Sequence, residues 1–319
     1  MPSLPKPIAI FYEHPDWFRP LFAELDRRGT PYQKLNAAQH RYSIAARNGS
    51  YALLFNRMSP SAWTRGHGHA IFYTLHFLAH LEAQGVRVVN GARAFAVEIS
   101  KARQLSLLES LRLPYPAARV IHHPAQAAEA ARGLRFPVIV KPNIGGSGVG
   151  IVRFDHPEQI ERAAASGQLQ LGPDHTALVQ EYIPARDGCI VRVEVLGGKF
   201  LYAIRIHLSG EGYNLCPADI CQTVDGRPLE RAACPADAPR TGLRVEACTP
   251  PPETIAAVER ILHAAGIEVG GVEYLVDDRD GRRLFYDINA LSNFVADAVR
   301  VVGFDPHARL VDYLEQEAR

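Results

Sequence analysis

The sequence lacks an excess of charge of either sign. Its 35 Lys and Arg residues are almost balanced by 34 Asp and Glu residues, which leaves a formal net charge of +1. This balance provides no broad basic surface for nucleic acid or for an anionic membrane, so neither is an expected partner. Any site that binds an anion must therefore be local.

Long apolar runs are also missing. No run approaches the roughly 18 residues that a membrane-spanning helix needs, and residues 1–7 do not have the charged-then-apolar layout of a signal peptide. Cysteine is scarce, with five in 319 residues, an odd number that lies late in the chain. Reduced thiols suit this pattern better than a disulfide framework, so we expect a cytoplasmic protein.

Four of the cysteines fall in the polar, proline-containing segment 209–251, which we expect to be an irregular loop. Cys216 and Cys221 are separated by four residues, but the second tight pair that zinc sites usually contain does not follow. Free thiols in a loop that helps to shape an acceptor pocket are the favoured interpretation. A structural zinc ion is the alternative.

Two common nucleotide-binding motifs are absent as well. Residues 145–150 contain four glycines and Ser147, between β-branched runs at 138–140 and 151–154. No Gly-Lys-Ser/Thr closes this loop, so it is not a P-loop, and the strand-like run after it excludes a dinucleotide fingerprint. So many glycines indicate a backbone that approaches a ligand closely, and exposed N–H groups suit phosphate oxygens. A plain glycine-rich turn is the alternative.

The remaining pattern predicts three units. Residues 1–93 alternate strand-like and helical stretches, which indicates a small parallel sheet. Residues 94–182 contain Lys101, Lys141 and the glycine loop, and they end at Ile183-Pro184, a natural hinge. Residues 183–319 contain two hairpins. In the first unit, Arg57, His67 and His69 are candidates for lining a cleft, although surface or capping roles are favoured for them.

The first hairpin, at 190–208, carries charged side chains inside apolar strands. The period of two puts Arg192 and Glu194 on one face of its first strand, and Arg205 and His207 on one face of its second. Unpaired buried charges are unfavourable. We therefore expect that the face with these charges is wet or meets an anion.

The last hairpin begins at Gly271 and turns at Asp278–Arg282. This turn places Glu273 opposite Asp287, with Asn289 on the same face as Asp287. Two carboxylates and an amide oxygen are suitable ligands for a hard cation such as Mg²⁺. A solvated sheet face with ordinary charges is the alternative.

The order of these features is similar to that of the ATP-grasp superfamily. Its elements are Lys101, V-I-V-K-P with Lys141, the glycine loop, V-Q-E-Y-I at 179–183, Glu273 and Asp287-Ile-Asn289. The best likeness, over nearly the whole chain, is to RimK-like and glutathione-synthetase-like carboxylate–amine ligases. It implies an α/β (α+β) ATP-grasp fold, with an N-terminal pre-ATP-grasp domain (1–93) before two α+β lobes (94–182 and 183–319) that clamp ATP.

The resemblance also implies how ATP is held. Lys101 and Lys141 would neutralise its phosphates, and a flap would cover them, formed by Gly145, Gly146, Ser147, Gly148, Val149 and Gly150. A hinge would read adenine through Glu181, Tyr182 and Ile183, while Asp187 would hold the ribose. Mg²⁺, or Mn²⁺ in its place, would be bound by Glu273, Asp287 and Asn289.

For the chemical step, the resemblance implies that Arg192 and Arg205 hold the transferred phosphate and the acyl substrate. Ser292 and Asn293 would contact substrate, and we add Asn214 from its position in the chain after Arg205. The chain departs from the family pattern at Ile190, where an acidic residue is usual. It also has Asp287 in place of the usual Glu and Glu273 in place of a frequent Asp, so the two side-chain lengths compensate. These departures bear on the substrate more than on ATP.

The hypothesis is therefore an ATP-dependent carboxylate–amine ligase. A carboxylate attacks the γ-phosphate of ATP to give an acyl phosphate and ADP, and an amine then displaces phosphate to form an amide. The expected partners are a small carboxylate and an amine, such as an amino acid or peptide, and family likeness implies a homo-oligomer. Two alternatives are a kinase of the same fold, which phosphorylates a hydroxyl, and a non-catalytic ATP-binding module.

Overall fold

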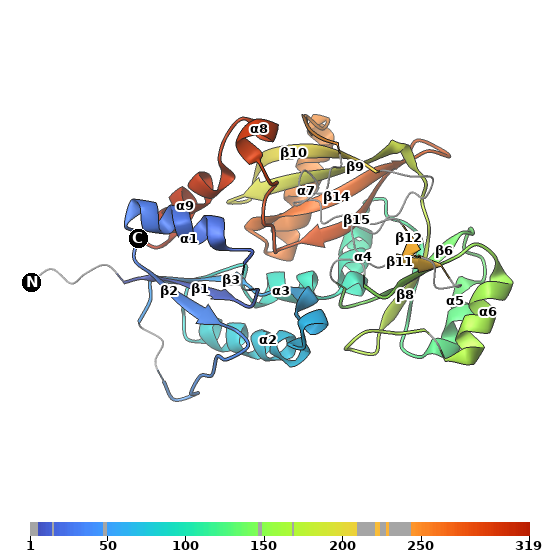
Figure 1. Ribbon diagram of the computed structural model, residues 1–319, viewed down its shortest axis with the longest axis horizontal. Helices are drawn as coiled ribbons and strands as arrows, with labels where there is room; N and C mark the ends of the chain where they lie inside the picture. The colour runs from blue at the N-terminus through green and yellow to red at the C-terminus, as the bar shows by residue number, and fades with distance from the viewer. Residues whose placement is uncertain are drawn as a thin grey trace, which may run out of the picture.

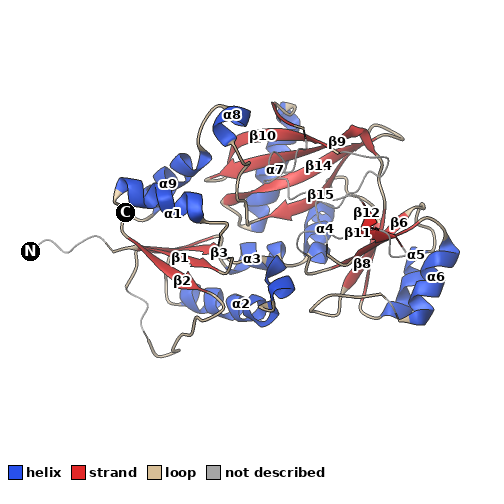
Figure 2. Ribbon diagram, viewed as in Figure 1, coloured by secondary structure: helices blue, strands red, loops and turns tan. Residues whose placement is uncertain are grey.

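The computed structural model describes residues 6–14, 16–46, 50–145, 149–167, 169–208, 221–223, 228–229 and 244–319. Its strands form three sheets that lie beside one another across the molecule (Figures 1 and 2). Within the described ranges, no helix is both long enough and apolar enough to cross a membrane. Cys189 and Cys248 are free thiols.

The N-terminal sheet is parallel and has the order β2-β1-β3-β4, as the alternating pattern predicts. The strands are β1 (Ile8–Tyr12), β2 (Tyr32–Asn36), β3 (Leu53–Arg57) and β4 (Val88–Val89). Helix α1 (Arg19–Arg28) connects β1 to β2, while η1 (Pro60–Arg65) and α2 (Gly68–Ala83) connect β3 to β4. Every residue of β3 is buried, as expected for a central parallel strand. Arg57 is the last of them.

The second sheet has the order β12-β11-β7-β6-β8-β5. Strands β6 (Val138–Pro142) and β7 (Ile151–Phe154) pair antiparallel on either side of the glycine loop, so the predicted strand–loop–strand is present. Strand β8 (Ala177–Glu181) pairs antiparallel with β6 on one side and with β5 (Ala118–Ile121) on the other. Helices η2 (Pro124–Gln126), α5 (Ala127–Ala131) and α6 (Pro157–Ser166) complete this lobe, and buried side chains of α5 and α6 share its core.

The expectation of a wholly irregular loop at 209–251 is wrong for its described parts. Strand β11 (Cys221–Thr223) pairs parallel with β7, β12 (Pro228–Leu229) pairs with β11, and β13 (Val245–Cys248) pairs with β10. Exposed sheet edges offer unpaired backbone groups that a passing segment can bond, whatever its side chains are. That explains why no side-chain pattern revealed these short strands. Residues 209–220, 224–227 and 230–243, which include Cys216 and Cys234, lie outside the described residues.

The third sheet is antiparallel and has the order β13-β10-β9-β14-β15. Its long strands are β9 (Ala185–Leu196), β10 (Lys199–His207), β14 (Val269–Asp277) and β15 (Arg283–Asn289). Helices α3 (Ala92–Glu98), α4 (Lys101–Ser110) and α7 (Pro252–Ala265) share one apolar core with it. Helices α3 and α4 thus pack on this sheet, although they fall within the predicted unit 94–182. The boundaries at 93 and 182 remain a prediction.

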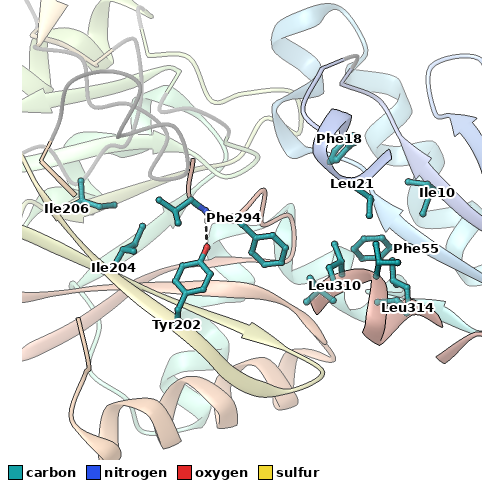
Figure 3. Packing of buried hydrophobic residues seen from close by; sticks show 14 of the residues in the cluster. Ile10, Phe18, Leu21, Phe55, Tyr202, Ile204, Ile206, Phe294, Leu310 and Leu314 are labelled. Carbon is teal, nitrogen blue, oxygen red and sulfur yellow. Dashed lines mark hydrogen bonds between the residues drawn. The ribbon is translucent and has the colours of Figure 1, made fainter. Parts of the chain in front are cut away.

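The opposite side of the third sheet packs toward the N-terminal sheet. Ile204 and Tyr202 of β10 belong to the same buried cluster as Phe18, Leu21 and Phe55 (Figure 3). Leu310 and Leu314 of helix α9 (Pro306–Glu317) complete this junction, and the short helix α8 (Ala298–Val302) precedes α9. The C-terminal helix therefore closes back on the first sheet, beside α1 (Figure 1).

Asn90 ties these two sheets together. Its side-chain Nδ2 donates to the carbonyls of Val269 (2.6 Å) and Ala290 (2.7 Å). Its Oδ1 accepts from the backbone N–H groups of Glu268 (2.9 Å) and Val269 (3.2 Å). The backbone φ of Asn90 is +56°, a region that asparagine tolerates better than most residues.

Candidate active site

Lys101 is the first residue of α4, and the segment after β6 fixes its position. Ser100 caps the helix, as predicted, with its Oγ accepting from the N–H of Arg103 at 3.2 Å. The Oδ1 of Asn143 accepts from Ser100 Oγ (3.0 Å) and from the N–H of Ala102 (2.9 Å), and its carbonyl accepts from the N–H of Lys101 (3.2 Å). The start of α4 and the base of the glycine loop therefore form one unit.

The described ends of the glycine loop lie close to both predicted phosphate-binding lysines. Lys141 is on β6, four residues before Gly145, and is buried. A Cβ on Gly145 would lie 3.7 Å from Cε of Lys101. Gly150 has a φ of +81°, and a Cβ there would lie 2.9 Å from Pro142, so only glycine fits at this point. Val149 is partly buried, while Gly146, Ser147 and Gly148 lie outside the described residues.

The acidic hairpin has the predicted register. Glu273 of β14 lies opposite Asp287 of β15, and Gly271 lies opposite Asn289. The register shifts between Glu273 and Tyr274, because Tyr286 is an extra residue in β15. The hydroxyl of Tyr286 donates to Glu273 Oε2 at 2.9 Å. The bulge therefore provides Glu273 with a partner that the simple two-residue period does not predict.

Two cations hold the paired carboxylates. Lys101 Nζ forms an ion pair with Asp287 Oδ1, which brings together two residues that are 186 positions apart. Arg192 of β9 lies opposite Glu273, and its Nη1 donates to Glu273 Oε1 at 2.8 Å. Its Nε donates to Glu194 Oε1 at 2.5 Å. The structure thus places a compact group of alternating charges on one face of the third sheet.

The donor set on this face fits a magnesium ion in its chemistry. Glu273, Asp287 and Asn289 provide two carboxylates and an amide, the oxygen groups that Mg²⁺ takes from proteins. Nδ2 of Asn289 donates to Asp287 Oδ2 at 3.2 Å, so the amide is adjacent to the carboxylate. Among the residues described, no three His, Cys, Asp or Glu side chains are grouped as metal ligands. Here Lys101 and Arg192 neutralise the carboxylates.

Two buried residues that the sequence did not single out position β15. Gln104 of α4 donates from Nε2 to the carbonyl of Ile288 (2.8 Å) and accepts at Oε1 from the N–H of Ile288 (3.2 Å). Glu98 accepts from the N–H of Ala290, and burial raises the pKa of Glu98. The only signal in the sequence is a polar side chain on an otherwise apolar helix face, which does not identify its partner.

Arg205 is not in this group, contrary to expectation. It lies opposite Val191, the neighbour of Arg192, and antiparallel partners share a face. Ile204, rather than Arg205, is therefore on the Arg192 face. The Arg205 side chain is 47% exposed and pairs with Glu246 at 3.4 Å. The alternation within each strand was predicted, but the register between the strands decides which arginines meet.

The predicted adenine hinge connects the second and third sheets. Tyr182 and Ile183 are buried, and the guanidinium of Arg153 lies 4.5 Å from the centre of the Tyr182 ring. Glu181 Oε1 accepts from the N–H of Arg135 at 2.8 Å. Asp187 is exposed, with a φ of +56°. Their nucleotide-binding roles remain a prediction.

The loop after β15 contains the predicted substrate residues, and Arg57 holds it. Arg57 Nη2 donates to Asn293 Oδ1 at 3.1 Å and to the carbonyl of Ser292. Asn293 also lines a cavity of about 1300 Å³ between the loop after β1 and the segment before α9. The other lining residues include His14, Trp17, Arg19, Arg300 and His307. Asn214 lies outside the described residues.

Comparison with known proteins agrees with this geometry. Residues 99–213 match the RimK-like ATP-grasp domain. The solved structure of the ATP-grasp ligase PsnB, complexed with a minimal precursor, superposes with a TM-score of 0.68 over 98% of this chain and 100% of that chain, at 20% identity. The chain therefore has the ATP-grasp fold, which confirms the predicted fold class, and its residues 99–213 are similar to the RimK-like ATP-grasp domain, in agreement with the resemblance.

The curated relatives are longer than this chain, which matches only part of each of them. The chain is 25% identical over 292 residues to the carbamoyl phosphate synthase large chain of Thermus thermophilus, a match that covers 86% of this chain and 25% of that protein. It is 29% identical over 199 residues to the D-alanine–D-alanine ligase of Kocuria rhizophila, covering 57% of this chain and 50% of that protein. The chain thus spans about a quarter of the first of these relatives.

Proposed function

We propose that this protein is an ATP-dependent carboxylate–amine ligase, which forms an amide through an acyl phosphate and releases ADP and phosphate. The observation that carries the proposal is the charge group of Lys101, Asp287, Arg192 and Glu273 on one sheet face, beside the base of the glycine loop. The RimK-like domain and the ligases among the similar proteins support it.

The proposed chemistry needs positioning and charge more than acid–base groups. Lys101 and Lys141 neutralise the ATP phosphates, and the glycine loop covers them. Glu273, Asp287 and Asn289 hold Mg²⁺, which supplies further charge neutralisation when bound. Arg192 is adjacent to Glu273 and holds the phosphoryl group as it moves to the substrate carboxylate. The hinge residues Glu181–Ile183 and Asp187 bind adenine and ribose.

The cavity beside Asn293 lies along the loop that follows β15, the strand that carries Asp287 and Asn289. It is bounded by aromatic and charged side chains, including Trp17, Arg19 and Arg300. Its volume of about 1300 Å³ exceeds the upper end, roughly 1000 Å³, of typical small-molecule pockets. We propose that an amino acid or a peptide enters here as the partner of the activated carboxylate.

The test is release of ADP and phosphate from Mg-ATP with a panel of amino acids, dipeptides and small carboxylates. We expect turnover only when an acid and an amine are both present. Asp287→Ala and Lys141→Ala should each lower kcat/KM by about 100-fold or more, because each removes a charge that the transferred phosphate needs. Neither ADP nor an amide from any pair would contradict the proposal. A stable phosphorylated product without amine dependence would indicate a kinase.

A further inference from the structure

Arg57 is buried, and no carboxylate among the described residues forms an ion pair with it. Its side chain lies at the carboxyl end of β3 and is 2% exposed. Nη2 is bonded to neutral acceptors of Ser292 and Asn293, whereas Nε and Nη1 have no hydrogen-bond partner in the described part of the chain. Phe18 and Phe55 rings lie 5.2 Å and 5.0 Å from the guanidinium carbon. Two donors of a charged group are thus left unsatisfied.

Such an arrangement is unfavourable in the free protein. Burying a charge without pairing it is costly, as is leaving a buried donor without an acceptor. Burial lowers the pKa of Arg57 to about 9, so the guanidinium stays charged at neutral pH. A ligand with an anionic group would satisfy it, as buried cations at functional sites commonly require.

Within the described ranges, Glu194 has an acceptor oxygen without a donor, the opposite of the unsatisfied donors of Arg57. It is 1% exposed, and although Oε1 accepts from Arg192, Oε2 has no hydrogen-bond partner among the residues described. Gly271 lies directly against this carboxylate, because a Cβ there would lie 2.9 Å from Oε2 and 3.1 Å from Oε1. An ammonium group, with three N–H donors, is the natural partner for a buried carboxylate oxygen.

One loop contacts Arg57 and the cross-strand neighbour of Glu194. Arg57 holds Ser292 and Asn293, while the hydroxyl of Tyr202 accepts from the N–H of Val295 at 2.9 Å (Figure 3). Tyr202 is the cross-strand partner of Glu194. Arg57 and Tyr202 therefore hold the two ends of a four-residue segment, and Asn293 of that segment lines the cavity.

The charge balance selects the kind of ligand. Arg57 and Arg192 carry two positive charges, and Glu194 and Glu273 carry two negative charges. Glu98 also interacts electrostatically with Arg57, but burial raises the pKa of Glu98 and favours its uncharged form, so the group is neutral. A simple anion would leave this buried group with an excess charge, whereas a zwitterion would not. A zwitterion also matches the two unsatisfied positions, one donor and one acceptor.

We infer that Arg57 and Glu194 form a subsite for the amine substrate, an α-amino acid, with its carboxylate on Arg57 and its ammonium on Glu194. This inference rests on the proposed ligase function. Glu194 is bonded to Arg192, so the nitrogen lies beside the acyl phosphate, whereas the carboxylate is held apart from it. Glu194 takes one proton from the ammonium. The nitrogen lone pair then forms the C–N bond while the C–O bond to phosphate breaks. Phosphate leaves with the electron pair of that bond and takes the second proton of the nitrogen, which leaves a neutral amide.

The test compares amino acids with their methyl esters, which lack the negative charge. The probes are the twenty common L-amino acids, D-alanine and their esters, assayed for ADP release with Mg-ATP and the carboxylate panel. We expect the wild type to prefer the acid of its substrate over the ester. Arg57→Met should raise KM for the acid by roughly 100-fold and remove this preference. The KM for ATP should change by less than about threefold.

Three further variants separate binding from folding. Arg57→Lys restores a cation and should recover part of the affinity. Glu194→Gln should raise KM and make the rate increase with pH, since the amine must then lose its proton to solvent. Arg260→Met is the matched control, because Arg260 is an exposed arginine that donates to one carbonyl, that of Leu111. If Arg57→Met does not fold, Arg57→Lys provides the comparison of acid with ester.

Binding of an amino acid, measured without ATP turnover, also tests the Arg57–Glu194 subsite. Each amino acid is added to the wild type and to the Arg57 variants, and the shift in Tm is measured. An amino acid that raises the Tm of the wild type, but not of Arg57→Met, supports the subsite even if ligase activity fails. Equal use of acid and ester by the wild type, an unchanged KM in Arg57→Met, or no Tm shift with any amino acid in an inactive wild type would overturn it.

Discussion

Asn90 carries a large share of the contact between the first and third sheets. Its buried amide satisfies two carbonyls and two N–H groups around Val269, Glu268 and Ala290. We expect Asn90→Ala to lower the free energy of unfolding by about 3 kcal/mol, because several buried backbone groups lose their partner. Urea unfolding measures this. Asn36→Ala is the control, since the exposed side chain of Asn36 accepts from the N–H of Ala38 at 2.9 Å, at the surface of the protein. Equal midpoints for the two variants would contradict the assignment.

Arg192 and Arg205 differ in their surroundings despite similar places in the sequence. Arg192 is bonded to Glu194 and Glu273, whereas Arg205 is on the opposite face and pairs with Glu246. We expect Arg192→Met to lower kcat/KM by about 100-fold or more, and Arg205→Met by less than about threefold. Both are measured as ADP release. A larger loss in Arg205→Met would place the catalytic group elsewhere.

Among single residues, the sequence predicted those whose partners lie close to them in the chain or across one turn. The Glu273–Asp287 pairing follows from one turn and a period of two, and Ser100 was recognisable as a helix cap. For Arg57 the favoured surface or capping role was wrong, because the side chain is buried, and Glu194 is also buried, on a face that was expected to be wet or to meet an anion. The significance of these two residues depends on burial and missing partners, which the sequence does not show. The tyrosine bulge at 286 is likewise a tertiary feature, since no turn residue marks it.

Helices α1 and α9 are joined through a chain of charges. Glu24 accepts from Arg27 and Arg28, and Arg28 also binds Asp312 and the carbonyl of Ala308. The hydrogen bond from Arg27, followed by that from Arg28, lowers the pKa of Glu24 to about 2 despite the opposing effect of burial. The ionised carboxylate therefore stabilises the folded state above its ordinary pKa of 4.5, and this contribution is lost between pH 4.5 and about 2.

We therefore expect Glu24→Gln to be less stable than the wild type by about 1 kcal/mol at pH 7. The difference should shrink as pH falls from 4.5 toward 2. Urea unfolding at a series of pH values measures it. Glu129→Gln is the control, because its pair with Arg132 has the same spacing but is exposed. A difference for Glu24→Gln that stays constant down to pH 2 would contradict the pKa argument.

Whole elements were predictable where hydrophobic patterns are regular. The parallel strands β1 and β3, the hairpin around the glycine loop and the β14–β15 hairpin all agree with their patterns. Strands β11–β13 were missed, because a short edge strand is specified by the backbone groups of its neighbour. Helices α3 and α4 pack on the third sheet, a placement that sequence order alone does not reveal.

The whole molecule brings its three sheets to one charged junction. Lys101 comes from α4, Arg192 and Glu273 come from the third sheet, and Arg57 comes from the carboxyl end of β3 in the first, while the glycine loop belongs to the second. The fold class could be predicted because the order of motifs spans nearly the whole chain. The identity of the substrates could not, because the cavity is built from loops whose side chains follow no period.

The central claim is that the substrate carboxylate attacks ATP directly. The most direct measurement uses an acid that supports turnover, labelled with ¹⁸O in its carboxylate, and follows the label by mass spectrometry of the released phosphate. Because an acyl phosphate transfers one carboxylate oxygen to phosphorus, the ligase predicts one ¹⁸O in each phosphate released. Phosphate without ¹⁸O, formed together with ADP and amide, would contradict the acyl-phosphate mechanism.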